Sequence, residues 1–184
     1  EPEPTTDGVW AETFDNLSNG TTADNSGSSR WSSNRAVGFF AVDDKKFSIS
    51  GASGSGRWTS QDIAIGSVDP VSFSINIWGE GGLESSGESL DWIKVLYSVD
   101  GGSPKLVTQK NGMFNSGNKL SVSSPQITGS RLRIIVEAST SGTGEAFHWD
   151  DIKVVTSSGE SPAPSPEPEP TTDGVWAETF DNLS

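Results

Sequence analysis

Residues 71–78 read VSFSINIW, an alternation of apolar and polar side chains. Four apolar residues share one face of this extended segment: Val71, Phe73, Ile75 and Ile77. A period of two indicates a β-strand with one buried face. Residues 91–100 and 131–138 alternate in the same way, and no stretch of the chain has a convincing helical period. The sequence therefore predicts an all-β protein.

Turn-forming residues separate these segments. Asp100, Gly101 and Gly102 stand between residues 91–100 and residues 105–109, which is a strong signal for an antiparallel hairpin. Clusters of Ser, Gly and Asn separate four shorter candidate strands: residues 38–42, 46–50, 62–65 and 119–122. Several strands at this spacing are typical of a β-sandwich. We predict an antiparallel β-sandwich over residues 9–156, long enough to bury a sizeable core without disulfide bonds.

The two ends of the chain share one sequence. Residues 1–18 read EPEPTTDGVWAETFDNLS, and residues 167–184 repeat them letter for letter. A long repeat of this kind indicates a tandem array of domains. Pro alternates with Ser, Ala and Glu near the second copy, which favours a semi-rigid polyproline II spacer. We predict four parts: a linker end (residues 1–8), a β-sandwich (9–156), a linker (157–174) and the first strand of the next repeat (175–184).

The second copy carries the apolar residues of a first strand. These residues form the predicted inter-repeat strand: Val175, Trp176, Phe180 and Leu183. The strand either completes its own repeat or adds to the sheet of a neighbouring copy. Strand addition of the second kind would join copies into a filament.

The chain is acidic and contains no cysteine. It has 25 Asp and Glu against 12 Lys and Arg, a formal net charge of −13, which argues against nucleic acid or an anionic membrane as a partner. We expect these charges mainly to keep the surface soluble, with divalent cations as a further use. No apolar run is long enough for membrane insertion.

Composition also bears on catalysis. His148 is the only histidine, so a His-rich zinc site and a His-dependent triad are excluded. Composition permits a glycosidase that uses two carboxylates. Nothing in the sequence indicates a cleft, however, and a near-identical enzyme repeated along a Pro-rich string would be unusual. We therefore predict that the chain is not an enzyme.

Candidate metal ligands lie near both ends of the predicted sandwich. On a strand, Glu12 shares a face with Phe14, and Asp150 shares a face with Ile152. Both carboxylates would point into the sandwich, where an unpaired charge is costly, so a shared cation is favoured. Ca²⁺ takes 6–8 oxygen ligands, and Asp24 lies in a loop able to supply more. In the alternative, Glu12 and Asp24 lie at the surface and Asp150 caps a turn.

An acidic loop at residues 79–91 contains four more carboxylates: Glu80, Glu84, Glu88 and Asp91. This loop either binds a second cation, lines a sheet edge or stays solvated and mobile. The sequence favours the solvated loop.

Seven tryptophans provide candidate sugar-stacking rings, since carbohydrate sites use exposed aromatic side chains. Trp92 falls on the face opposite the apolar residues of its strand, and we expect Trp58 and Trp78 in loops at a sheet end. Arg57 is a polar neighbour in this candidate glycan site. In the alternative, these rings pack beneath loops or on the second sheet.

Several short motifs recur in an order known from one group of modules. They are E-x-F-D at residue 12, G-T-x-x-D at residue 20, W-S at residue 31, D-x-I-x-V-x-Y-S-V-D-G-G at residue 91 and W-D-D-I-K-V at residue 149. This order resembles the jelly-roll repeats of giant cell-surface adhesins and of polysaccharide-degrading proteins in gliding Bacteroidota. It is more distantly similar to calcium-containing carbohydrate-binding modules of the galactose-binding-like type.

The resemblance implies a structural calcium between the first strand, a loop and the last strand. Its ligands would be Glu12 and Asp150, with Asp151 as the substitute if the register slips by one. We therefore expect a structural or adhesive repeat of a large secreted or surface-anchored bacterial protein. Its partners would be neighbouring copies and surface polysaccharide. A carbohydrate-binding module attached to a polysaccharide-binding or polysaccharide-degrading protein is the alternative.

Overall fold

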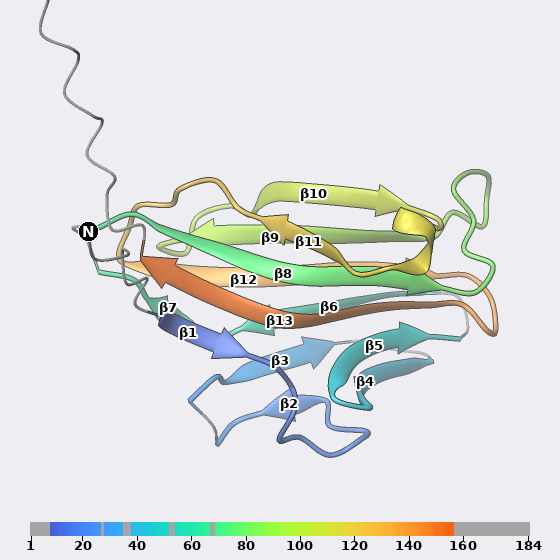
Figure 1. Ribbon diagram of the computed structural model, residues 1–184, viewed down its shortest axis with the longest axis horizontal. Coiled ribbons are helices and arrows are strands. Elements are labelled where there is room, and N and C mark those ends of the chain that lie inside the picture. The colour runs from blue at the N-terminus through green and yellow to red at the C-terminus, as the bar shows by residue number, and fades with distance from the viewer. Residues whose placement is uncertain (1–7, 27, 35–37, 52–53, 67–68, 157–184) are drawn as a thin grey trace, which may run out of the picture.

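The computed structural model describes residues 8–26, 28–34, 38–51, 54–66 and 69–156. These residues form two antiparallel sheets, which stack face to face (Figure 1). The expected all-β sandwich is confirmed. Regular helix in this part of the chain is limited to one 3-10 turn, Asn115–Gly117.

The first sheet, called the β13 sheet, is built around the last strand. Its order is β11 (Leu120–Ser123), β8 (Val71–Glu80), β13 (Ala146–Thr156), β5 (Lys46–Ser50) and β4 (Phe39–Asp43). The first strand, β1 (Gly8–Glu12), pairs with the second half of β13, beyond the segment that β5 occupies.

The second sheet, called the β12 sheet, contains the central hairpin. Its order is β10 (Lys105–Asn111), β9 (Trp92–Val99), β12 (Arg131–Thr140), β6 (Gly54–Ser60), β3 (Trp31–Asn34) and β2 (Ala23–Asp24). The short strand β7 (Ile63–Ala64) pairs with the start of β12.

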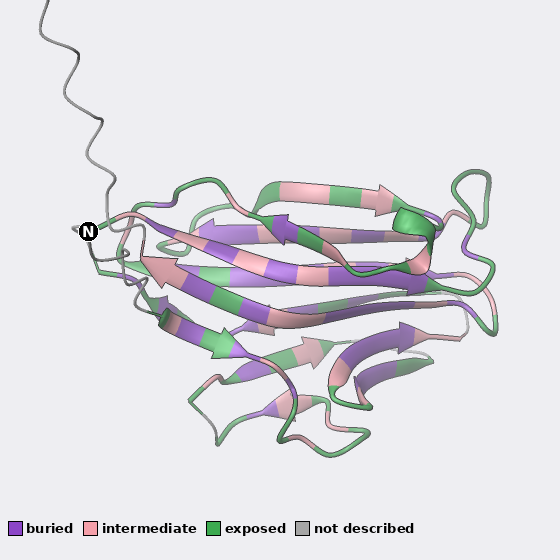
Figure 2. Cartoon of the chain, viewed as in Figure 1, coloured by how far each residue is buried: buried purple, intermediate pink, exposed green. Residues whose placement is uncertain are grey.

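Alternating burial along the strands builds the core between the sheets (Figure 2). In β8 the four alternating apolar residues that define its inner face are buried: Val71, Phe73, Ile75 and Ile77. Aromatic side chains fill one part of the interior, where the stacked rings of Phe47 and Trp149 have centroids 4.9 Å apart. Burial of these large side chains is the main force that holds the two sheets together.

The hairpin of β9 and β10 forms where turn chemistry predicts it. Asp100 and Gly101 have φ values of 51° and 76°. Positive φ at both central residues is the requirement of a tight hairpin turn, and Asp-Gly satisfies it at low cost. The Gly102 N–H donates to the Val99 carbonyl at 2.8 Å and closes the turn.

The segment 54–60, which the sequence places among loops, forms strand β6. Its sequence, GSGRWTS, is rich in Gly and Ser and has a low intrinsic preference for a strand. Pairing with β12 on one side and β3 on the other supplies its backbone hydrogen bonds. Tertiary pairing therefore overrides local propensity here.

The first copy of the duplicated sequence belongs to this sandwich. Trp10 pairs with Val154 and Glu12 with Ile152, and Gly8 lies opposite Val155. The start of β1 is therefore beside the end of β13. The predicted inter-repeat strand, Val175, Trp176, Phe180 and Leu183, lies outside the described residues.

Candidate functional site

Glu12 ends β1 as a buried carboxylate that is 6% exposed. Its Oε1 accepts a hydrogen bond from the Phe14 N–H at 2.7 Å, and its Oε2 accepts one from the Ser29 hydroxyl at 2.8 Å. Burial raises the pKa of Glu12 above its usual value, and the nearby negative charge of Asp24 adds to the rise. These two hydrogen bonds oppose the shift because they stabilise the ionised form.

Asp24 lies in β2 and is 9% exposed. Its Oδ1 accepts hydrogen bonds from the Ser26 N–H at 3.0 Å and the Ser26 hydroxyl at 3.2 Å. A pocket of about 310 Å³ lies beside it. Seven residues that line the pocket carry side-chain oxygens suited to Ca²⁺: Glu12, Thr13, Asp15, Asn16, Asp24, Ser28 and Ser29. We call this region the Glu12 pocket.

Asp150 lies on the outer face of the β13 sheet, away from the core that Glu12 adjoins. Between Asp150 and Lys153 the register with β8 shifts, because β13 contains one extra residue there. Asp151 takes a φ of 52° at this bulge. Trp149 and Ile152 both remain buried, so the alternation reverses between them. The expectation that Asp150 shares the inner face with Ile152 is therefore wrong.

Lys119 forms ion pairs with both bulge carboxylates on the outer face. Its Nζ lies 3.3 Å from Asp150 Oδ2 and 3.6 Å from Asp151 Oδ2. The Asn76 side chain also donates to Asp151 Oδ2 at 3.0 Å. Burial raises the pKa of Asp150, although its hydrogen bond from the Asp151 N–H and the Lys119 charge oppose that rise.

The four predicted calcium ligands thus divide into two pairs. Within the described part of the chain, one group of three carboxylates has ligand atoms within 4.8 Å of one another, and it contains none of the four. The structure brings Glu12 and Asp24 together and places Asp150 and Asp151 with Lys119. Calcium binding at the Glu12 pocket stays a prediction.

Two of the predicted glycan residues are buried. Trp58 is 0% exposed, and its ring packs between Phe14 and Trp31, with centroids 6.1 and 6.0 Å away. Trp78 lies 5.2 Å from the ring of His148, and Lys119 Nζ lies 4.8 Å from its centroid. Both tryptophans lie in strands, β6 and β8, so the expectation of loop positions is wrong.

Trp92 and Arg57 lie on the outer face of the β12 sheet, as expected for a surface site. Trp92 is half-buried, and Lys94 Nζ lies 4.4 Å from its ring centroid. Arg57 Nε donates to Glu137 Oε1 at 2.8 Å. Sequence reasoning missed Lys94 and Glu137, although their strand alternation already places them outward.

Strand register aligns these polar residues across the sheet. One row runs through five adjacent strands: Asn34, Arg57, Glu137, Lys94 and Gln109. The neighbouring row contains Ser55, Ser139, Trp92 and Asn111. We call these two rows the polar face. It combines one aromatic ring with many hydrogen-bonding groups.

His148 has a structural environment on the outer face of the β13 sheet. Its Nδ1 is 2.8 Å from the Ser48 hydroxyl, and its Nε2 is 3.5 Å from a Glu80 carboxylate oxygen. Burial lowers the pKa of His148 below its usual value, and the Glu80 charge only partly offsets this effect. A neutral, packed imidazole fits these contacts.

Comparisons with known proteins identify the fold. Neither a family model nor a curated protein matches the sequence. The K3 cleaved adhesin domain of Lys-gingipain from Porphyromonas gingivalis is similar in structure, with a TM-score of 0.54 and 8% identity, over 81% of this chain and 99% of that one. This likeness establishes a shared β-sandwich fold of the jelly-roll kind.

Carbohydrate-binding modules are also similar. One is a family 61 module solved with β-1,4-galactotriose, with a TM-score of 0.46 and 14% identity, over 69% of this chain and 87% of that one. Another is the C-terminal family 22 module of Xyn10B from Clostridium thermocellum, with a TM-score of 0.40 and 16% identity, over 86% of this chain and 98% of that one.

Among the described residues, no helix has the length and apolar character needed to cross a membrane.

Proposed function

We propose that this chain is one repeat of an extracellular or cell-surface array, with a structural and adhesive role. The observation that carries the proposal is the letter-for-letter recurrence of residues 1–18 at residues 167–184, beside a Pro-rich segment. An acidic surface keeps neighbouring domains apart and soluble. Weak contacts made by each domain would add up through multivalency.

The position of β1 supports a role that transmits force between repeats. Gly8 and Val155 are opposite each other, so the preceding and following segments leave the domain at neighbouring points of one sheet. Tension between these points acts first on the outermost β1–β13 pairs. A calcium ion in the Glu12 pocket would tie the other end of β1 to β2, which belongs to the other sheet. We include this ion in the proposal because the pocket has the required oxygen ligands.

Small-angle X-ray scattering of chains with one, two and three repeats tests the array. An array predicts that the largest dimension increases with each repeat by about one extended linker, because the start of β1 lies beside the end of β13. The linker contributes up to roughly 50 Å at ~3.1 Å per residue. A maximum dimension that stays constant while mass increases would contradict the proposal, because the repeats would then pack together.

A comparison of two chain lengths tests whether the second copy completes its own repeat or a neighbouring domain. A chain that ends at Ser157 retains β1 and β13 and is expected to be a monomer. If residues 175–184 complete a neighbouring domain, the full chain forms ordered multimers, which light scattering after gel filtration detects. Monomers in both cases would remove strand exchange and leave a string of self-contained domains.

The polar face supports carbohydrate binding as a second candidate function. Trp92 provides a ring for stacking against a sugar, while Lys94, Arg57, Glu137 and Gln109 provide donors and acceptors for hydroxyl groups. Both candidate functions consist of binding or support, and neither requires catalysis.

A glycan array probed with the full chain tests this second function. Trp92→Ala should abolish any binding by the polar face, whereas Met113→Ala removes an exposed apolar side chain elsewhere and serves as the control. Binding that survives Trp92→Ala would exclude the polar face. A clean negative array would leave the structural role as the proposed function.

A further inference from the structure

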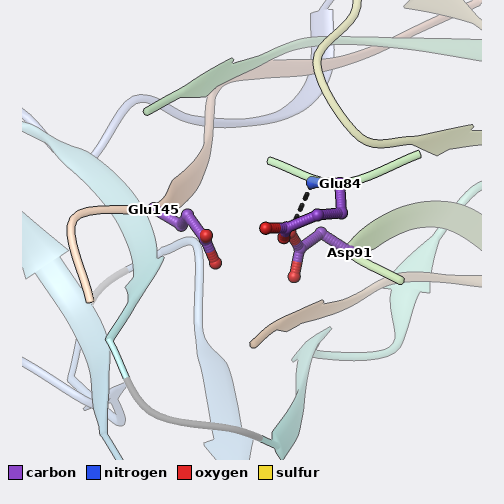
Figure 3. A group of neighbouring side chains, drawn as sticks. All are labelled: Glu84, Asp91 and Glu145. Carbon is purple, nitrogen blue, oxygen red and sulfur yellow. Dashed lines mark hydrogen bonds between the residues drawn. The ribbon is translucent and has the colours of Figure 1, made fainter. Parts of the chain in front are cut away.

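Two loops bring carboxylates together at the end of the sandwich farthest from the start of β1 (Figure 1). Glu84 and Asp91 come from the connection between β8 and β9, and Glu145 immediately precedes β13. Their carboxylates lie close together in Figure 3, with ligand atoms within 4.8 Å of one another. We call these three residues the acidic cluster.

Asp91 and Glu145 are held firmly by backbone groups. Asp91 is 0% exposed, and its two oxygens accept hydrogen bonds from the Glu84 N–H at 2.8 Å and the Ser141 N–H at 2.7 Å. Glu145 Oε2 accepts from the Gly142 N–H at 2.6 Å. The Ser141 hydroxyl is 3.2 Å from Glu84 Oε2. Each carboxylate keeps further lone pairs for another ligand.

The acidic cluster lacks a cation within the described part of the protein. No Lys, Arg or His nitrogen described there forms an ion pair with Glu84, Asp91 or Glu145. Three negative charges at this separation repel one another, and burial strengthens the repulsion. A side-chain contact with Asp91, followed by burial and the Glu145 charge, raises the pKa of Glu84.

A buried hydroxyl provides a second, independent observation. Thr140 is 0% exposed, and its Oγ1 has no hydrogen-bond partner among the residues that the structure describes. Inner positions of β12 alternate through Val136 and Ala138, so Thr140 also points inward. Ser139 pairs with Trp92, the first residue of β9, so Thr140 lies opposite Asp91, which directly precedes β9. The unpaired hydroxyl is therefore directed to the side of the sheet where the Asp91 carboxylate lies.

We propose that Glu84, Asp91, Glu145 and the Thr140 hydroxyl form a binding site for a divalent cation, Ca²⁺. Carboxylate and hydroxyl oxygens are hard ligands, and ligands from irregular loops suit the flexible coordination of Ca²⁺ better than the strict octahedron of Mg²⁺. The bound ion would join the β8–β9 and β12–β13 connections, which already share hydrogen bonds from Ser141 to Asp91 and Glu84. This site uses different elements from the Glu12 pocket and does not depend on the proposed function.

Calcium titration of the EDTA-treated full chain by isothermal calorimetry tests the proposal. Glu84→Gln is the main variant because Glu84 is exposed and its removal leaves the core intact. Glu88→Gln removes an equal charge from the same loop, outside the acidic cluster, and is the matched control. We expect Glu84→Gln to weaken one calcium site by roughly tenfold or more, the equivalent of about 1.4 kcal/mol. The control should bind as the unmodified chain does.

Thr140→Val separates ligand binding from packing, because valine preserves shape and removes the hydroxyl. Weaker calcium binding in this variant supports the site. Unchanged binding with a higher melting temperature would instead identify an ordinary unsatisfied hydroxyl and remove Thr140 from the site. The proposal as a whole is overturned if the unmodified chain binds no Ca²⁺, or if Glu84→Gln and Glu88→Gln weaken binding equally. A Glu12→Gln variant assigns any second calcium site to the Glu12 pocket.

Discussion

The Glu12 pocket and the acidic cluster both concentrate carboxylates, but different forces organise them. Glu12 follows the buried Trp10 and precedes the fully buried Phe14, so packing in the core fixes this segment. Asp91 instead joins two loops by accepting backbone N–H groups from Glu84 and Ser141. Apolar burial thus fixes the position of Glu12, whereas Asp91 itself holds the surrounding loops together. The two regions should therefore respond differently to loss of packing and to loss of charge.

The largest expected effect is the loss of packing beside the Glu12 pocket. Phe14→Ala leaves a cavity among Trp31, Phe47 and Trp58, and should reduce the free energy of unfolding by about 3–5 kcal/mol. Urea unfolding followed by tryptophan fluorescence measures it. Phe180→Ala makes the same change in the second copy and is the control. If both variants lowered the free energy of unfolding equally, the second copy would also contribute its phenylalanine to a packed core.

Calcium should stabilise the Glu12 pocket by a smaller amount. At a free Ca²⁺ concentration one hundred times its dissociation constant, a site that is absent from the unfolded chain contributes about 2.7 kcal/mol. Thermal unfolding in Ca²⁺ and in EDTA should show this gain, and Glu12→Gln should remove the part that belongs to the pocket. The variant Asp15→Asn tests whether the neighbouring carboxylate contributes. An unchanged calcium effect in Glu12→Gln would exclude the pocket as its source.

Loss of the Asp91 charge should destabilise the acidic cluster in the absence of calcium. Asp91→Asn replaces one accepting oxygen with a donor, so either the Glu84 or the Ser141 N–H loses its part-buried hydrogen bond. The expected cost is about 1–3 kcal/mol in the free energy of unfolding. Hydrogen exchange at Glu84 and Ser141 reports the local change, with Asp69→Asn, away from the cluster, as a control. Unaltered exchange at both amides would show that Asp91 does not join the loops.

The smallest effect is the pH dependence of Glu12. Its pKa in the folded protein is raised above the ordinary value of 4.5, so the folded state binds a proton more readily than the unfolded state does. Without calcium, ionised Glu12 therefore lowers stability at pH 7, and this penalty disappears as pH falls through the raised pKa toward 4.5. Glu12→Gln should be more stable than the unmodified chain at pH 7. Its advantage in urea unfolding should shrink as pH falls, and an advantage that grows instead would reverse the sign of the shift.

Strand alternation and turn chemistry predict much of this fold. Residues 71–78 and 131–138 form strands β8 and β12 because one face of each is apolar and the other is polar. The Asp-Gly turn at residue 100 fixes the hairpin because its backbone angles are set locally. Alternation and turn chemistry do not predict strand β6, because its Gly and Ser residues become extended only through pairing with strands on both sides.

The candidate sites were only partly predictable. Burial of Glu12 follows from its alternation with Trp10, but one bulge at Asp151 reverses the face of Asp150. A bulge leaves no clear mark in a period of two, so the sequence gives no warning of it. The acidic loop drew attention to Glu84 and Asp91, whereas Glu145 is distant in the sequence and joins them only when the loops meet.

The sequence by itself determined the all-β class, the hairpin, the acidic charge and the duplicated segment at residues 1–18 and 167–184. Each depends on local pattern or on composition, which need no knowledge of distant partners. Tertiary structure alone decided that Trp58 is buried, that Asp150 faces outward and that the carboxylates of Glu84, Asp91 and Glu145 converge. These outcomes depend on strand order and register, because contacts between segments far apart in the chain exist only after the two sheets have packed.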